Sequence, residues 1–118
     1  MKTNQILLCF VLWSLIVNLA IGKEVYIYAE NVHIRDADGP CFSSPSTECP
    51  VIGSVTRAYC DASCQLQGEL IEVKPYPPND WWSLVQCPGV PKRGWVTNLY
   101  IRGPAKLEGV PKCRRRTV

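Results

Sequence analysis

The 118-residue sequence has little of what catalytic and metal sites are built from: a single histidine, His33, no Cys-x-x-Cys pair and no glycine-rich nucleotide-binding motif. Only 19% of the residues are charged, too few for a coiled coil or a charge-rich disordered tail. No helix-period pattern of useful length appears, and one domain is all the length allows. We therefore expect neither a metal nor a cofactor.

The N-terminal residues have the layout of a secretory signal peptide, predicted to span 1–22. Met1-Lys2 gives a positive start, an almost wholly apolar run follows from Ile6 to Ala20, and Ala20 and Gly22 are small enough for a signal peptidase site. About fifteen apolar residues fall short of the roughly 20 that span a bilayer, which favours cleavage over a membrane anchor. We expect a secreted, extracellular protein that has no stable membrane span.

Charge is unevenly distributed over the mature chain, which carries twelve bases against ten acids. The body is slightly acidic, so nucleic acid is not an expected partner. Residues 103–118 form a predicted basic tail that ends near the run Arg114-Arg115-Arg116. That run could anchor the protein to an anionic surface, mark a processing site or be a solvated end.

Short apolar runs broken by Pro, Gly, Asn and Asp predict an all-β domain over residues 23–102. In the first run Val25, Ile27 and Ala29 share one face, and two tyrosines share the other. A long loop is expected over residues 36–50 and another over 87–93. The expected strands lie within 25–29, 32–35, 51–55, 64–73, 81–85 and 94–101, enough for a small five- to six-stranded barrel that closes its own edges.

Several segments, in this order, resemble bacterial-type Src homology 3 domains: Asn31-Val32-His33-Ile34-Arg35, Pro45-Ser46-Thr47 with Pro50-Val51-Ile52-Gly53, and Asp80-Trp81-Trp82-Ser83-Leu84-Val85 followed by Gly94-Trp95-Val96 and Asn98-Leu99-Tyr100-Ile101. The last stretch is also similar to eukaryotic Src homology 3 domains. Thr97 stands where those domains carry a groove proline. The resemblance covers residues 25–102 and implies an SH3-like barrel that serves as a binding module, attached to cell-wall hydrolases or secreted alone.

Six cysteines remain after cleavage, and an even number in a short secreted chain predicts three disulfides. The pairing is open among 15 connectivities. Cys60 and Cys64 lie roughly 13 Å apart if both are on one strand, and would then bond to different partners; if they flank a turn they could pair. Cys41 and Cys49 bracket a loop and are predicted to staple it. The remaining two cysteines are Cys87 and, in the tail, Cys113, whose bond would pin the tail to the barrel.

Aromatic residues of the closing strands are the best candidates for a binding site. Trp81 and Trp82 are adjacent on a strand, so their rings point to opposite faces and one ring is expected at a groove. By resemblance to the eukaryotic motif, the groove residues are Trp81, Asn98 and Tyr100. Arg35 and Asp36, where the loop over residues 36–49 begins, are the candidates beside them. The alternative is that both rings pack against the two long loops.

We expect a monomeric, non-catalytic module that recognises an extracellular peptide or a cell-wall polysaccharide or peptidoglycan; a secreted effector or defence protein fits this description. The alternatives are a cell-wall hydrolase fragment and a disulfide-rich toxin or inhibitor that acts through its basic tail. Enzyme activity is not expected, because His33 lies on an alternating strand and points outward. Asp36 and Asp38 sit in a Gly-Pro loop and are more easily understood as turn formers.

Overall fold

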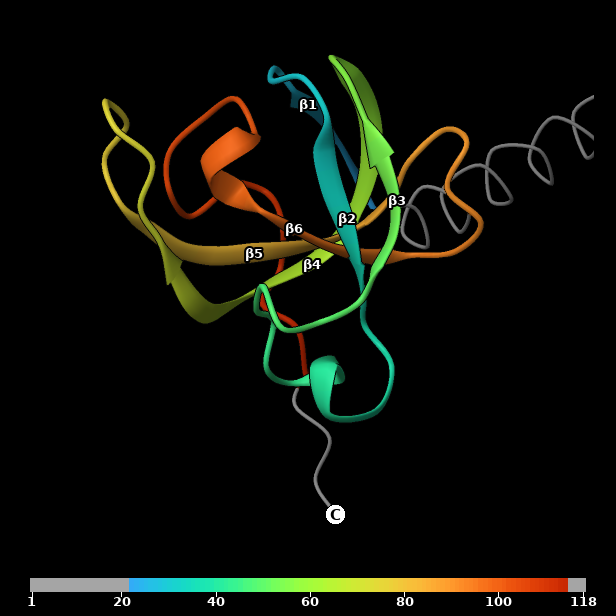
Figure 1. Cartoon of the computed structure of the whole chain (residues 1–118). Helices are drawn as coiled ribbons and strands as arrows, with labels where there is room; N and C mark the ends of the chain where they lie inside the picture. The colour runs from blue at the N-terminus through green and yellow to red at the C-terminus, as the bar shows by residue number, and fades with distance from the viewer. Residues whose placement is uncertain (1–21, 115–118) are drawn as a thin grey trace, which may run out of the picture.

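The computed structural model describes residues 22–114, and within them the fold is all-β (Figure 1). The strands and 3-10 turns are β1 (Lys23–Ile27), β2 (Val32–Asp36), η1 (Gly39–Phe42), β3 (Val51–Val55), β4 (Ala58–Ile71), β5 (Asn79–Gln86), β6 (Gly94–Thr97) and η2 (Asn98–Tyr100). No helix in this part of the chain is long and apolar enough to cross a membrane. The predicted signal peptide lies, apart from Gly22, outside the described residues.

All six strands belong to one antiparallel sheet, ordered β1-β4-β5-β6-β2-β3, which curls into a half-barrel (Figure 1). The 14-residue strand β4 pairs with both β1 and β5. Its pairing with β5 shifts register between Ala62 and Cys64 and again between Gln67 and Ile71, and such irregularities bend a strand. This confirms the predicted small all-β, disulfide-stapled fold.

Alternation along the strands builds the core, as the sequence pattern predicts. Val25 and Ile27 of β1 and Val32 and Ile34 of β2 are buried in one cluster. A second, smaller cluster holds Trp82 and Trp95 together with Leu66 and Ala37. Because two of the four tryptophans are core residues, fewer aromatic rings are available for a ligand than their number in the sequence suggests.

Three disulfides stabilise the domain, as is typical of extracellular proteins. Cys41–Cys49 closes the loop between β2 and β3, the predicted pairing. Cys60 and Cys64 both lie on β4 and have different partners, Cys87 and Cys113. The bridge to Cys113 ties the C-terminal segment to the middle of the sheet.

Residues beyond Arg102 continue the folded domain as far as Cys113, although the sequence places them in a tail. Leu107 and Val110 are both 6% exposed and belong to the main core cluster. The Gln65 side-chain amide donates to the carbonyl oxygens of Leu107 and Val110, each at 2.8 Å, and its oxygen accepts from the Leu107 N–H at 2.9 Å. Only the last residues of the predicted basic tail, including Arg115 and Arg116, lie outside the described residues.

Candidate functional site

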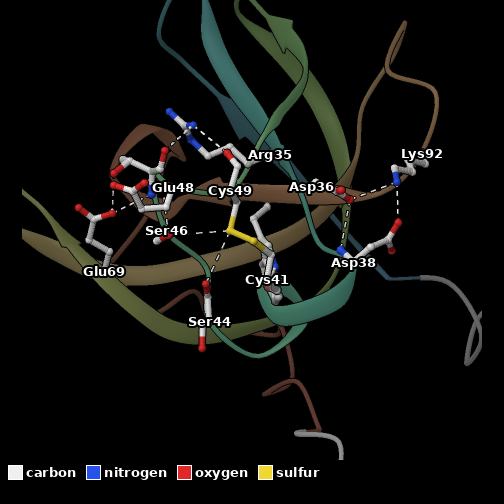
Figure 2. The surroundings of a disulfide bond; sticks show 12 residues. Arg35, Asp36, Asp38, Cys41, Ser44, Ser46, Glu48, Cys49, Glu69 and Lys92 are labelled. Carbon is white, nitrogen blue, oxygen red and sulfur yellow. Dashed lines mark hydrogen bonds and ion pairs between the residues drawn. A yellow bond between two sulfur atoms is a disulfide. The ribbon is translucent and has the colours of Figure 1, made fainter.

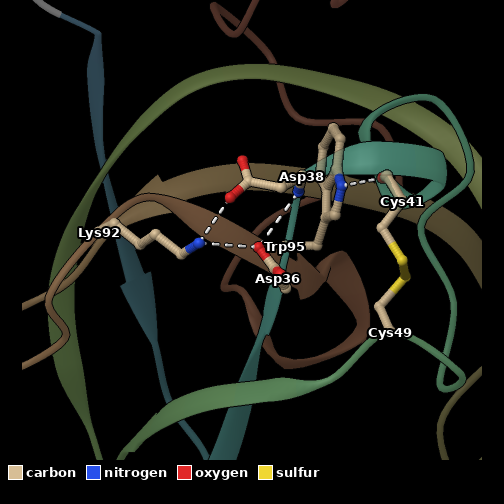
Figure 3. A network of polar contacts seen from close by, with 6 residues as sticks. All are labelled: Asp36, Asp38, Cys41, Cys49, Lys92 and Trp95. Carbon is tan, nitrogen blue, oxygen red and sulfur yellow. Dashed lines mark hydrogen bonds and ion pairs between the residues drawn. A yellow bond between two sulfur atoms is a disulfide. The ribbon is translucent and has the colours of Figure 1, made fainter.

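The loop between β2 and β3 is held against the sheet at several points, so it forms a shaped wall. The Trp95 indole donates from Nε1 to the Cys41 carbonyl at 2.6 Å (Figure 3). The Arg35 guanidinium donates from Nη1 to the carbonyl oxygens of Thr47 and Cys49, both at 3.0 Å (Figure 2). Together with the Cys41–Cys49 bridge, these bonds hold the part of the loop around Thr47 and Cys49 beside β2.

Arg35 and Asp36, predicted as neighbours in one site, point to opposite sides of β2 (Figure 2). Asp36 accepts from Lys92 at 3.1 Å, and Lys92 also bonds Asp38 at 2.6 Å (Figure 3). The hydrogen bond from Lys92 lowers the pKa of Asp36, and the bonds to Asp38 and Asp36 raise the pKa of Lys92. Asp36 therefore links the two long loops and lies away from the Arg35 side.

The two adjacent tryptophans lie on opposite faces of β5, and the structure separates their roles. Trp82 is only 2% exposed, and its Nε1 donates to the Glu69 carbonyl at 2.9 Å. Trp81 is half-buried on the other face, where Lys106 Nζ lies 5.2 Å from its ring centroid. Trp81 is therefore not brought together with Arg35 and Tyr100.

Asn98 is part of the buried polar framework of the domain, with 2% of its surface exposed. Its Oδ1 accepts from the Ser83 hydroxyl at 2.5 Å, and its Nδ2 donates to Gln65 Oε1 and to the Ala105 carbonyl, each at 3.1 Å. These three bonds occupy most of the amide's capacity. Asn98 therefore positions η2 and the C-terminal segment and offers little to a ligand.

Arg35 and Tyr100 do meet, in a groove of ≈ 380 Å³ that we call the β2 groove. It runs along the face of β2 that carries His33 and Arg35, and η2, β5 and the end of β4 complete it. His33 is exposed, while Arg35 and Tyr100 are half-buried. Its lining residues include Val32, His33, Arg35, Val73, Trp82 and Tyr100.

A carboxylate next to the groove fixes the loop wall. Glu69 Oε1 accepts from both the backbone N–H and the hydroxyl of Thr47 at 2.7 Å, and these bonds, with a smaller contribution from Arg35, lower the pKa of Glu69. Glu69 is therefore ionised at neutral pH and holds Thr47 at the groove rim. The other guanidinium nitrogens of Arg35 form no hydrogen bond with residues 22–114, so they can donate to a ligand.

Several residues at or beside this groove are not among the site residues predicted from the sequence; they include Trp82, Thr47 and Glu69. Alternation places Trp81 and Trp82 on opposite faces of the strand but does not say which face is buried, so only the burial pattern of neighbouring strands could have distinguished them. The bond between Glu69 and Thr47 joins residues 22 positions apart and has no sequence signature.

The β2 groove presents hydrogen-bond donors from His33 and Arg35 beside the half-buried ring of Tyr100. All six cysteines within residues 22–114 are in disulfides, and no group of three His, Cys, Asp or Glu side chains in that range is placed to hold a metal ion. Histidine is represented by His33 alone.

Such a fold and site define a small disulfide-stapled β domain with a surface groove. The chain matches no protein-family model, no curated protein and no solved structure.

Proposed function

We propose that this protein is a secreted, non-catalytic binding module that recognises an extracellular peptide or cell-wall polymer in the β2 groove. The observation that carries the proposal is that Arg35 and Tyr100 line one groove whose loop wall is fixed by a disulfide and by Glu69. A preformed wall lowers the entropy lost on binding. The likeness of its motifs to those of Src homology 3 domains supports the same proposal of a binding module.

An extended peptide suits this groove better than a sugar chain. Trp82 is 2% exposed, so its indole offers no open face on which a sugar ring could stack. His33 and Arg35 instead place donors along β2, where main-chain carbonyls or a carboxylate of a peptide can accept them. The half-buried Tyr100 ring can receive an apolar side chain beside them.

The proposal is tested by screening the refolded mature protein, residues 23–118, against arrays of peptides and of cell-wall polymers. Two exposed valines give a matched pair of variants: Val73 lines the β2 groove, whereas Val51 lies on the edge strand β3 outside it. Val73→Asp introduces a charge into the groove and is expected to weaken binding of any array hit at least tenfold, while Val51→Asp binds as the wild type does.

Circular dichroism on both variants shows that the fold is intact. Equal effects of the two substitutions would contradict the placement of the site. A free thiol or substrate turnover in the purified protein would favour the hydrolase alternative, and loss of binding on truncation after Cys113 would favour the toxin or inhibitor that acts through its basic end.

A further inference from the structure

A row of tyrosines lies on a different part of the surface from the β2 groove. Tyr26 of β1 and Tyr28, which directly follows that strand, lie on the face opposite the buried Val25 and Ile27, as their alternation predicts, and both are half-buried. The Tyr26 ring lies 4.7 Å from that of Tyr59 on β4. The Tyr28 ring lies 6.0 Å from that of Tyr76 in the loop between β4 and β5.

Part of this row lines a second groove, of ≈ 340 Å³, which we call the tyrosine groove. It lies where the loop between β4 and β5 approaches η2 and the C-terminal segment (Figure 1). Its walls include the ring side chains of Tyr76, Pro77 and Pro78 from the loop, Tyr28 from the chain just after β1, and Arg102 from the C-terminal segment.

The groove has a positive charge and no acidic side chain among its lining residues. The Arg102 guanidinium lies 4.7 Å from the Tyr26 ring centroid and forms no ion pair with any residue in 22–114. Lys106, four residues further on, stacks on Trp81 and is likewise without an acidic partner in that range. Of these two cations only Arg102 lines the groove, so an anionic ligand there meets one cation that has no acidic partner in residues 22–114.

Main-chain donors in the groove are largely occupied. The N–H groups of Tyr28, Arg102 and Ile101 donate to the carbonyls of Tyr100, Tyr26 and Asn98, at 3.1, 2.9 and 3.0 Å. The Tyr76 N–H donates to Val73, and prolines 77 and 78 have no N–H. A peptide backbone would find few N–H donors in the groove, so recognition depends on the ring faces and the guanidinium.

From this arrangement we propose that the tyrosine groove binds an acidic polysaccharide, with sugar rings packed on Tyr28 and Tyr76 and a uronate carboxylate paired with Arg102. The C–H faces of a pyranose ring pack on aromatic rings, whose faces are electron-rich. The Tyr28 hydroxyl already donates to the Leu99 carbonyl at 2.7 Å, so the ring faces carry the contact with the sugar. The tyrosine groove is separate from the β2 groove, so this proposal and the proposed function can be tested independently.

The test measures binding of the mature protein to oligogalacturonate by calorimetry at 0.15 M salt, with fully methyl-esterified oligogalacturonate as the uncharged control and poly-glutamate as the acidic peptide. The wild type is expected to bind oligogalacturonate and to bind the other two at least tenfold more weakly. Arg102→Gln and Tyr76→Ala should each weaken binding about tenfold. Arg57→Gln, which removes an exposed cation paired with Glu30, should leave it unchanged.

Several outcomes would overturn the proposal: no binding by the wild type, equal affinity for the esterified polymer, or poly-glutamate bound as tightly as oligogalacturonate. If Arg102→Gln binds oligogalacturonate as tightly as the wild type, the polymer binds to the C-terminal arginine run and not to the tyrosine groove. Because Val73→Asp disables only the β2 groove, that variant should retain oligogalacturonate binding, and this separates failure of the second site from failure of the proposed function.

Discussion

Replacing Gln65 by methionine tests how the C-terminal segment is held to the sheet. Gln65 has no exposed surface, and its amide forms four hydrogen bonds, with the Leu107 N–H, the carbonyls of Leu107 and Val110, and Asn98. Methionine has nearly the same shape and makes none of them. The buried N–H and carbonyl groups then lose their partners, at about 1–3 kcal/mol for each unsatisfied group.

We expect Gln65→Met to lower the free energy of unfolding by about 3–5 kcal/mol, a large part of the roughly 5–15 kcal/mol of a typical domain. Urea unfolding measures this value. Gln67→Met is the matched control on the same strand, because Gln67 is exposed and bonds Asp80 alone; it should change stability by less than about 0.5 kcal/mol. A loss below about 1 kcal/mol for Gln65→Met would refute the reasoning.

Three further predictions concern other bonds of the domain. Replacing Cys64 and Cys113 by alanine opens a loop with a sequence separation of 49 residues and should cost about 4 kcal/mol in urea unfolding, against about 2.5 kcal/mol for the loop disulfide, whose separation is 8. The pKa of Glu69 is lowered from 4.5 in the folded protein, so the stabilisation from its carboxylate is fully present above pH 4.5 and is lost as the pH falls through the lower folded value. Glu69→Gln should therefore reduce the fall in the free energy of unfolding between pH 7 and 3, measured by urea unfolding. Trp81→Ala should still give the near-ultraviolet circular dichroism of a folded domain and should bind in the β2 groove as the wild type does. Weaker binding of the array hit by this variant would show that Trp81 belongs to the site.

The strands could be predicted because their pattern is local. Alternation of apolar and polar residues predicts Val25 and Ile27 in the core and Tyr26 and Tyr28 on the opposite face, and the structure confirms that Val25 and Ile27 are buried while the two tyrosines are half-buried. The start of β4 was not predicted: Ala58 to Ser63 lacks an apolar run, and its strand conformation comes from pairing with β1. The segment after Arg102 was placed in a tail because its two core residues, Leu107 and Val110, are isolated between prolines and glycines.

The candidate site was predictable only in part, because it depends on which strands meet. The sequence brought Arg35 and Tyr100 into one site, and both line the β2 groove. Asn98 was placed there by resemblance, but its amide is used by Ser83, Gln65 and a backbone carbonyl. Such long-range bonds are set by strand register, which no local pattern encodes.

Chemical-shift mapping by nuclear magnetic resonance, with the mature protein and its best array ligand, tests the central claim most directly. The account predicts shifts that gather on His33, Arg35, Tyr100 and the indole N–H of Trp82, with the ligand recovered unchanged after incubation. Shifts confined to residues outside the β2 groove, or a ligand that is cleaved during the titration, would contradict it.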